Sequence, residues 1–248
     1  MPRNLATPTQ PGVHAPQQQR GREREKALIR AGLRLTETRD WDDVRVSDIA
    51  AEIGCSTGTF YTRFHNKDAY FDVLLDLLVQ AMVRHTEAFH ADAARTREGP
   101  AGFVAQWVHM GVQSFRQHRG LYATAMLKLR RLAPTERSRS PLICLREASR
   151  ARLLQTMGQH AGWNTPAAQQ RLICAHQFMQ GVLINAVLTD PGPLHLGDDA
   201  FETELTAMVL AYLGLTPPAS ASPSKPTAQA ARTRRPRPSP LTPAQETP

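Results

Sequence analysis

The chain has 248 residues, of which 41% are hydrophobic, and its 30 Lys and Arg against 22 Asp and Glu give a formal net charge of +8. This length suffices for one or two packed domains, and a mean hydropathy of −0.39 excludes a protein built mainly of membrane-spanning helices. The sequence pI near 10.0 favours a polyanionic partner. The three scattered cysteines, Cys55, Cys144 and Cys174, predict no disulfide framework. With no signal-peptide pattern at the N-terminus, we expect a cytoplasmic protein.

Both ends of the chain are rich in proline. Residues 1–21 contain four prolines, and residues 216–248 contain nine. Because proline lacks a backbone N–H and breaks helix interiors, we expect these two segments to be disordered or extended tails. The ordered part is then predicted to run from residue 22 to residue 215.

Residues 22–215 show the periodicity of α-helices. Apolar residues recur at intervals of three and four, as in Phe71, Leu74, Leu75 and Leu78. No sustained alternation of β-branched residues with polar ones is present, and glycine or proline interrupts the helical pattern at several points. The sequence therefore predicts an all-α fold of about nine helices.

A motif at about residues 45–64 predicts a helix-turn-helix. The buried faces of its two helices are marked by Ile49, Ala50, Ile53, Phe60 and Phe64. Gly54 permits the left-handed turn that ends the first helix, and Ser56 or Thr57 is suited to cap the second. In such motifs the second helix enters the major groove of DNA. Its exposed residues are hydroxyls, a phenol and a guanidinium, which suit phosphates and base edges.

Several residues in and around this motif form a family pattern. They are Ala27-Leu28-Ile29, Trp41, Asp48-Ile49-Ala50, Ile53-Gly54, Ser56, Gly58-Thr59, Phe60-Tyr61, Phe64 and Asn66-Lys67. Residues 22–80 thus resemble the DNA-binding domain of the TetR family of transcriptional regulators. Two positions depart from the pattern, because Arg45 replaces the usual Ser or Thr cap and Cys55 replaces an apolar residue. Asp48 can still favour the start of the first helix through the helix dipole.

The resemblance implies roles for single residues. Tyr61 and Lys67 would bind backbone phosphates, and the residues facing the bases would be Thr57, Gly58, Thr62 and Arg63. The full set of candidate DNA-binding residues is Ser47, Thr57, Gly58, Thr59, Tyr61, Thr62, Arg63, His65 and Lys67. The partner is then a double-stranded DNA operator.

Residues 81–215 correspond to the effector-binding and dimerisation domain that the resemblance implies. Large aromatic and Met side chains in this part could line an apolar cavity, although ordinary core is the more common role of any single one of them. The candidates are Trp107, Met110, Phe115, Tyr122, Met126 and Phe178. In the family, ligand binding in this domain moves the fourth helix and changes the spacing between the two DNA-binding domains of the dimer. The sequence does not identify the small-molecule effector.

The last two predicted helices, residues 165–190 and 200–215, carry broad apolar faces. Such faces exceed what packing within one chain needs, so we expect a homodimer built on a two-fold four-helix interface. A dimer would place two recognition helices on successive major-groove turns and predicts a palindromic operator.

The net charge is unevenly distributed. Residues 22–68 hold nine basic and nine acidic residues, whereas residues 116–152 hold ten basic and two acidic ones. These bases could form a solvated face that balances the acidic segment 190–204, or some of them could meet an anionic effector such as a carboxylate or an acyl thioester. The basic segment 216–248 could add non-specific DNA affinity or have no role.

The chain contains no H-E-x-x-H, G-x-S-x-G or P-loop motif, and its nine histidines lie singly, so we expect neither an enzyme nor a metal or cofactor site. The sequence favours a ligand-responsive repressor. It leaves open an activator or a ligand-independent architectural protein of the same fold, and an all-α enzyme or interaction module without DNA binding.

Overall fold

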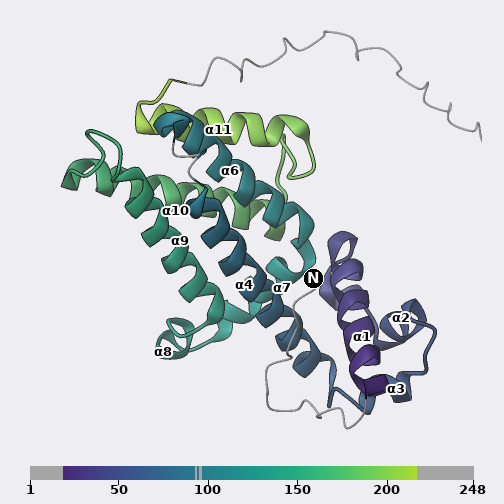
Figure 1. Ribbon diagram of the computed structural model, residues 1–248. Helices are drawn as coiled ribbons and strands as arrows, with labels where there is room; N and C mark the ends of the chain where they lie inside the picture. Colours follow the sequence, from purple (N-terminus) through teal and green to yellow (C-terminus); the bar gives the residue numbers. More distant parts are fainter. Residues whose placement is uncertain (1–18, 93, 95–96, 217–248) are drawn as a thin grey trace, which may run out of the picture.

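The computed structural model describes residues 19–92, 94 and 97–216, which form ten α-helices and one 3₁₀-helix and no strand (Figure 1). The elements are α1 (Gln19–Thr38), η1 (Trp41–Asp43), α2 (Val46–Glu52), α3 (Thr57–Tyr61), α4 (Lys67–Ala91), α6 (Gly99–Gln117), α7 (Arg119–Arg131), α8 (Pro134–Arg137), α9 (Pro141–Met157), α10 (Pro166–Leu188) and α11 (Asp199–Leu213). The all-α prediction is confirmed. The count exceeds the expected nine because residues 134–137 form the separate four-residue helix α8.

The predicted segment boundaries agree only in part with these elements. Helix α1 begins at Gln19, three residues before the predicted start of the ordered part, so the proposed N-terminal tail of residues 1–21 is too long. Helix α4 runs through residue 80, where the boundary between the two domains was predicted, and therefore belongs to both of them. Residues 1–18 and 217–248 lie outside the described residues, so both tails stay predictions.

An aromatic cluster holds the N-terminal helices together. The ring centroids of Phe60 and Phe64 are 5.3 Å apart, and that of Tyr70 lies 4.7 Å from Phe64. The Tyr70 hydroxyl donates a hydrogen bond of 2.6 Å to the carbonyl of Leu28, which ties α4 to α1. Burial raises the pKa of this hydroxyl above its ordinary value. The cluster fixes α3 against α1 and α4, because rings of this size bury large areas and pack in defined geometries.

The N-terminal helices meet the rest of the molecule where the end of α1 touches the start of α7. A Cβ atom on Gly120 would lie 2.3 Å from the Arg39 carbonyl oxygen and 3.0 Å from that of Thr36. Real Cβ atoms do not approach oxygen so closely, so this junction requires glycine.

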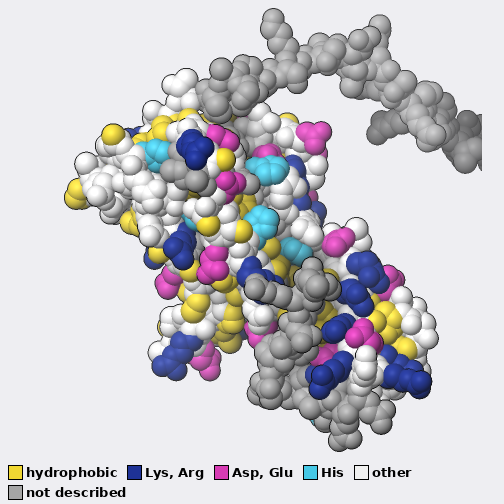
Figure 2. All heavy atoms as spheres, in the orientation of Figure 1, with side chains coloured by type: hydrophobic (Ala, Val, Ile, Leu, Met, Phe, Trp, Pro, Cys, Tyr) yellow, Lys and Arg dark blue, Asp and Glu magenta, His cyan; other side chains and the backbone are white. Residues whose placement is uncertain are grey.

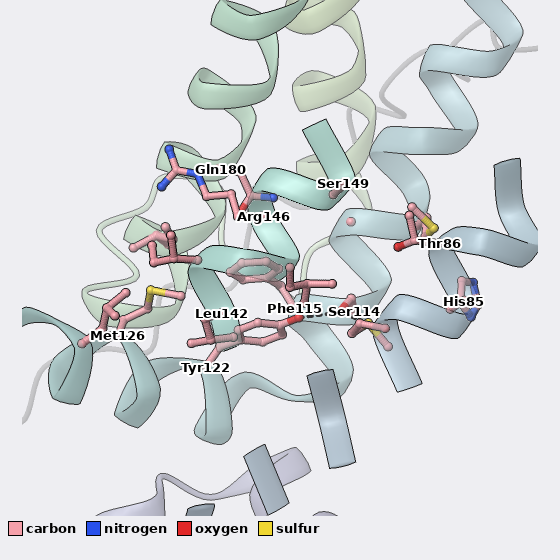
Figure 3. Close-up of a pocket in the computed structure, with 17 residues that line it drawn as sticks. His85, Thr86, Ser114, Phe115, Tyr122, Met126, Leu142, Arg146, Ser149 and Gln180 are labelled. Atoms are coloured by element: carbon pink, nitrogen blue, oxygen red, sulfur yellow. Dashed lines mark hydrogen bonds between the residues drawn. The ribbon is translucent and has the colours of Figure 1, made fainter. Parts of the chain in front are cut away.

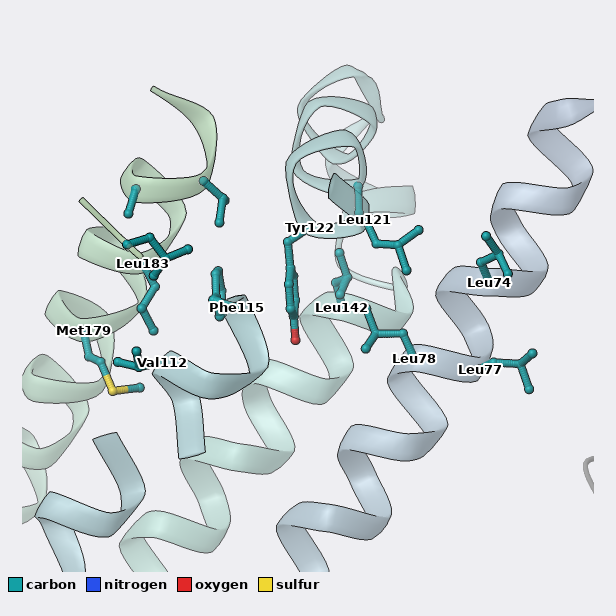
Figure 4. Close-up of a cluster of buried hydrophobic side chains, with 14 of the residues drawn as sticks. Leu74, Leu77, Leu78, Val112, Phe115, Leu121, Tyr122, Leu142, Met179 and Leu183 are labelled. Carbon is teal, nitrogen blue, oxygen red and sulfur yellow. The ribbon is translucent and has the colours of Figure 1, made fainter. Parts of the chain in front are cut away.

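The C-terminal helices form a bundle in which α10 packs against α6, α7, α9 and α11, and α4 packs against α9 (Figure 1). Within its core the rings of Phe115 and Tyr122 stack face to face with centroids 4.2 Å apart, with Leu121, Leu142 and Leu78 on the Tyr122 side of the pair (Figure 4). None of the described helices combines the length and the apolar composition that a bilayer-spanning segment requires.

Candidate nucleic-acid interface

At the start of α2, where the Ser or Thr cap is missing, Asp48 forms hydrogen bonds in addition to the dipole effect expected from the sequence. The Asp48 carboxylate accepts a hydrogen bond of 3.0 Å from the Arg45 backbone N–H and one of 2.9 Å from the Arg39 guanidinium. These bonds, the Arg45 one foremost, lower the pKa of Asp48. Gly54 ends the first helix of the motif with a φ of +64°. The helix-turn-helix is therefore formed by α2 and α3.

Six of the nine predicted DNA-binding residues are exposed to solvent, five of them at or just after α3, and Thr59 of α3 is half-buried. Ser56 caps it, since its hydroxyl accepts a hydrogen bond from the backbone N–H of Thr59. Exposed residues at and near α3 are Thr57, Gly58, Tyr61, Thr62 and His65, and Ser47 on α2 is exposed as well. The Tyr61 side chain packs edge-on against Phe60 but is 51% exposed, so its hydroxyl is free to reach outward.

Arg63 is not exposed, and the expectation that it faces base edges is wrong. Its side chain is 10% exposed and lies 2.7 Å from Glu25 of α1, whose side chain is 4% exposed. The pair joins the end of α3 to α1, 38 positions earlier in the chain. Two further Arg63 nitrogens, Nε and Nη1, are buried without a hydrogen-bond partner. Arg63 therefore serves to hold the second helix of the motif in place.

Lys67, at the first position of α4, lies beside the motif and is only partly exposed. Its ammonium donates a hydrogen bond of 2.6 Å to the Trp41 carbonyl and lies 4.7 Å from the centre of the Trp41 indole. Burial is the main cause that lowers its pKa. An ammonium has three hydrogens, so two stay available for a phosphate oxygen while the third binds Trp41.

The surface of this domain mixes both signs of charge. Figure 2 shows Lys and Arg (dark blue) interspersed with Asp and Glu (magenta) over the region of α1 and α2. This agrees with the equal numbers of basic and acidic residues in 22–68. Any recognition of a polyanion here must depend on individually placed groups rather than on bulk charge.

The C-terminal domain contains a cavity of about 100 Å³ between α4, α6, α7, α9 and α10, here called the effector cavity (Figure 3). Four of the six residues predicted from sequence line it: Met110, Phe115, Tyr122 and Met126. The Tyr122 hydroxyl lies 2.9 Å from that of Ser114, and burial raises its pKa. Arg146 and Gln180 lie beside each other on one side of the cavity (Figure 3).

The other two predicted cavity residues lie elsewhere. Trp107 is 1% exposed and stacks on His176 at 5.9 Å between ring centroids. Burial lowers the pKa of His176 to about 4, so this imidazole is a neutral core residue. Phe178 is 48% exposed on the outer face of α10, where its ring meets that of Tyr212. Neither residue touches the effector cavity.

The ten bases of segment 116–152 lie in different surroundings, and Lys128 pairs with Asp68 of α4 at 2.8 Å. Arg116 donates hydrogen bonds of 2.7 Å to the carbonyls of Leu196 and Asp198, and Arg119 lies 3.5 Å from the carboxylate of Asp190. These two arginines bind the acidic segment 190–204. Of the ten bases, all within the described residues, Arg146 alone lines the effector cavity.

The N-terminal part of the chain, which holds the helix-turn-helix, is similar to known proteins. Residues 28–74 match the model of the family described as bacterial regulatory proteins, tetR family. The HTH-type transcriptional regulator EthR of Mycolicibacterium smegmatis is 30% identical over 98 residues, which cover 40% of this chain and 44% of that protein. The match thus spans less than half of that relative.

Solved structures resemble the fold over about four fifths of the chain. A tetR-family transcriptional regulator from Streptomyces coelicolor has a TM-score of 0.55 at 18% identity and covers 77% of this chain and 80% of its own. The ketosteroid transcriptional regulator KstR2 of Mycobacterium tuberculosis has a TM-score of 0.51 at 17% identity, with coverage of 81% and 97%. At these identities the likeness concerns the fold.

Proposed function

We propose that this chain, which carries the N-terminal domain of the TetR family of bacterial regulatory proteins, is a cytoplasmic repressor that binds a palindromic operator as a homodimer and leaves it when a small molecule occupies the effector cavity. The observation that carries the proposal is the exposed face of α3. It offers Thr57, Tyr61 and Thr62 to a major groove, with Lys67 beside it.

Two kinds of contact are expected from this face. Tyr61 and Lys67 lie at the edge of this face. The phenol of Tyr61 and the ammonium of Lys67 can bind phosphate oxygens whatever the DNA sequence is. Thr57 and Thr62 carry short side chains that can reach base edges or a thymine methyl group. Arg63 takes no part in base contacts because it is buried against Glu25.

Replacement of Lys67 by alanine is expected to weaken binding by a similar factor for all DNA sequences, and to lower the slope of log affinity against log salt by about one per protomer. Thr62→Ala should instead change the preference among operator variants. Equilibrium titrations of operator and scrambled DNA at several salt concentrations measure both effects. Arg152→Ala, an exposed arginine of α9 that makes only a local bond to Gln155, is the matched control. A sequence-selective loss in Lys67→Ala would contradict this division of roles.

The proposed dimer interface is the outer face of α10 and α11. Phe178, Met208 and Tyr212 expose 48%, 45% and 39% of their surface there, and they line a groove of about 580 Å³. Other residues of the broad apolar faces, among them Leu183 and Val209, are already buried within the chain. Exposed aromatic and Met side chains in one groove are typical of the core of a protein interface.

A Phe178→Glu substitution is expected to convert the dimer to a monomer and to weaken operator binding by about thirtyfold or more, because a central aromatic residue of an interface contributes about 2 kcal/mol or more. Sedimentation equilibrium and DNA titration measure the two effects. The control is Leu127→Glu, at a residue of α7 that is 47% exposed and lies away from this groove. This variant should keep the wild-type oligomeric state and the wild-type operator affinity. A dimer that persists in Phe178→Glu would place the interface elsewhere.

The effector cavity is linked to the DNA-binding face by α4. Met82, His85 and Thr86 of α4 line the cavity, and the same helix begins at Lys67 beside α3. A volume of about 100 Å³ is smaller than the roughly 300–1,000 Å³ of ordinary ligand sites, so an effector must widen it. Widening displaces α4 and with it the position of Lys67. Arg146 in the cavity wall favours an effector with an anionic group.

A further inference from the structure

We propose that a second cavity, at the junction of the two domains, binds a small amphipathic anion such as a medium-chain carboxylate. This hinge cavity has a volume of about 200 Å³ and is lined by residues of α1, α4 and His118, which connects α6 to α7. It shares no residue with the effector cavity. The helices that form it lie side by side where the N-terminal domain meets the C-terminal bundle (Figure 1).

The walls of the hinge cavity are apolar. Ile29 and Leu33 of α1 face Leu77, Leu78 and Ala81 of α4 across it. Ile29, Leu77 and Leu78 are each less than 8% exposed, and Leu33 and Ala81 are half-buried. An alkyl chain or a small ring would bury its surface here and gain the hydrophobic contribution of each methylene group.

The rim of the hinge cavity is basic. Lys26 and Arg30 from α1 and Arg84 from α4 line it, and none of the described Asp or Glu residues does. Arg30 and Arg84 form no ion pair with any of the described residues, whereas Lys26 lies 3.3 Å from Glu23. Two guanidinium groups on opposite helices, without an ion pair to the described part of the chain, suit a carboxylate that can accept hydrogen bonds from both.

His118 adds a polar group to the same cavity. Its Nδ1 atom is buried without a hydrogen-bond partner, and burial lowers the pKa of the imidazole. A buried polar atom without a partner is uncommon in folded proteins, because such an atom loses its hydrogen bonds to water. With the ring hydrogen on Nδ1, His118 would donate to an oxygen of the bound anion.

A bound anion would join the two domains, because Arg30 belongs to α1 and Arg84 to the middle of α4. Bridging them holds α1 at a fixed angle to α4, and so fixes the position of the helix-turn-helix relative to the dimer interface. We therefore expect the ligand to change operator affinity. This regulatory step rests on the proposed function, whereas ligand binding itself does not.

The binding claim is tested by calorimetric titration of the full-length protein with octanoate in the absence of DNA. We expect saturable binding to one site per protomer, and binding at least about tenfold weaker in the double variant Arg30→Gln/Arg84→Gln, which removes two charge-assisted contacts. Ala81→Leu fills the cavity from the α4 side and should abolish binding. Arg24→Gln, an exposed arginine of α1 outside the cavity, is the matched control and should bind octanoate like the wild type. Octan-1-ol, with the same chain and no charge, should bind at least about tenfold more weakly than octanoate.

Lack of saturable octanoate binding overturns the proposal. So does equal affinity in the wild type, the double variant and Ala81→Leu, which would place the ligand in another cavity. Thermal unfolding of each variant without ligand shows whether that variant is folded. If Ala81→Leu does not fold, the test still rests on Arg30→Gln/Arg84→Gln, because both arginines are exposed. Operator titration with and without saturating octanoate then tests the regulatory step. An unchanged operator affinity refutes that step alone, and failure of the free protein to bind any operator refutes the proposed function while leaving octanoate binding intact.

Discussion

Replacement of Arg63 by alanine is expected to lower the free energy of unfolding by about 3–5 kcal/mol, because it breaks a buried ion pair by removing one of its two charges. The two side chains are 10% and 4% exposed and lie 2.7 Å apart. Urea unfolding followed by circular dichroism measures the loss. Operator binding should fall for all sequences together, because α3 loses its attachment to α1.

Two further variants separate this role from direct DNA contact. The double variant Glu25→Leu/Arg63→Met removes both charges of the pair. Its loss in free energy of unfolding should be much smaller than the sum of the losses measured for Glu25→Leu and Arg63→Met separately. Arg45→Ala removes an exposed arginine near the start of α2 and should change stability little. If Arg63→Ala keeps the wild-type stability but alters the preferred operator sequence, Arg63 faces the bases after all.

Gly120→Ala is expected to destabilise the protein by about 1–3 kcal/mol, the usual cost of forcing an extra group into a packed site. The new methyl group would collide with backbone oxygens of Arg39 and Thr36, which cannot rotate away as a side chain can. The end of α1 must then move from the start of α7. Because this shift also moves α3, operator affinity should fall as well.

Gly197→Ala is the matched control for this substitution. A Cβ atom on Gly197 would have no neighbouring atom within 4 Å, and the backbone there has no positive φ, so the same chemical change meets open space. Its free energy of unfolding should stay within about 0.5 kcal/mol of the wild type. Equal stability of the two variants, with equal operator affinity, would mean that the α1–α7 junction tolerates the displacement and does not set the position of the DNA-binding helices.

The helix-turn-helix could be predicted from sequence because its signals are local. Gly54, the Ser56 cap and the apolar spacing of Phe60 and Phe64 lie within a few residues of one another. The burial of Arg63 could not be predicted in this way, since its partner Glu25 lies on another helix. A five-residue helix also has too few turns for periodicity to separate its buried side from its exposed one.

The effector cavity was predicted in part, for a related reason. Apolar periodicity shows that Trp107 and Phe178 lie on helix faces, but not which neighbour each face meets. Trp107 packs into the core against His176, and Phe178 points out of α10. The hinge cavity could not be predicted from the sequence, because its basic rim combines Arg30 and Arg84, which belong to helices that only the tertiary fold brings together.

Selection of genomic DNA fragments by the purified full-length protein, followed by footprinting, tests the central claim most directly. We expect the enriched fragments to share a palindrome whose half-sites lie about one helical turn, or a multiple of it, apart. The Tyr61→Ala/Lys67→Ala variant, folded to the same extent, should enrich none of them. Absence of any enriched fragment at low salt, or equal enrichment by that variant, would contradict the assignment of α3 and Lys67 as the DNA-binding surface.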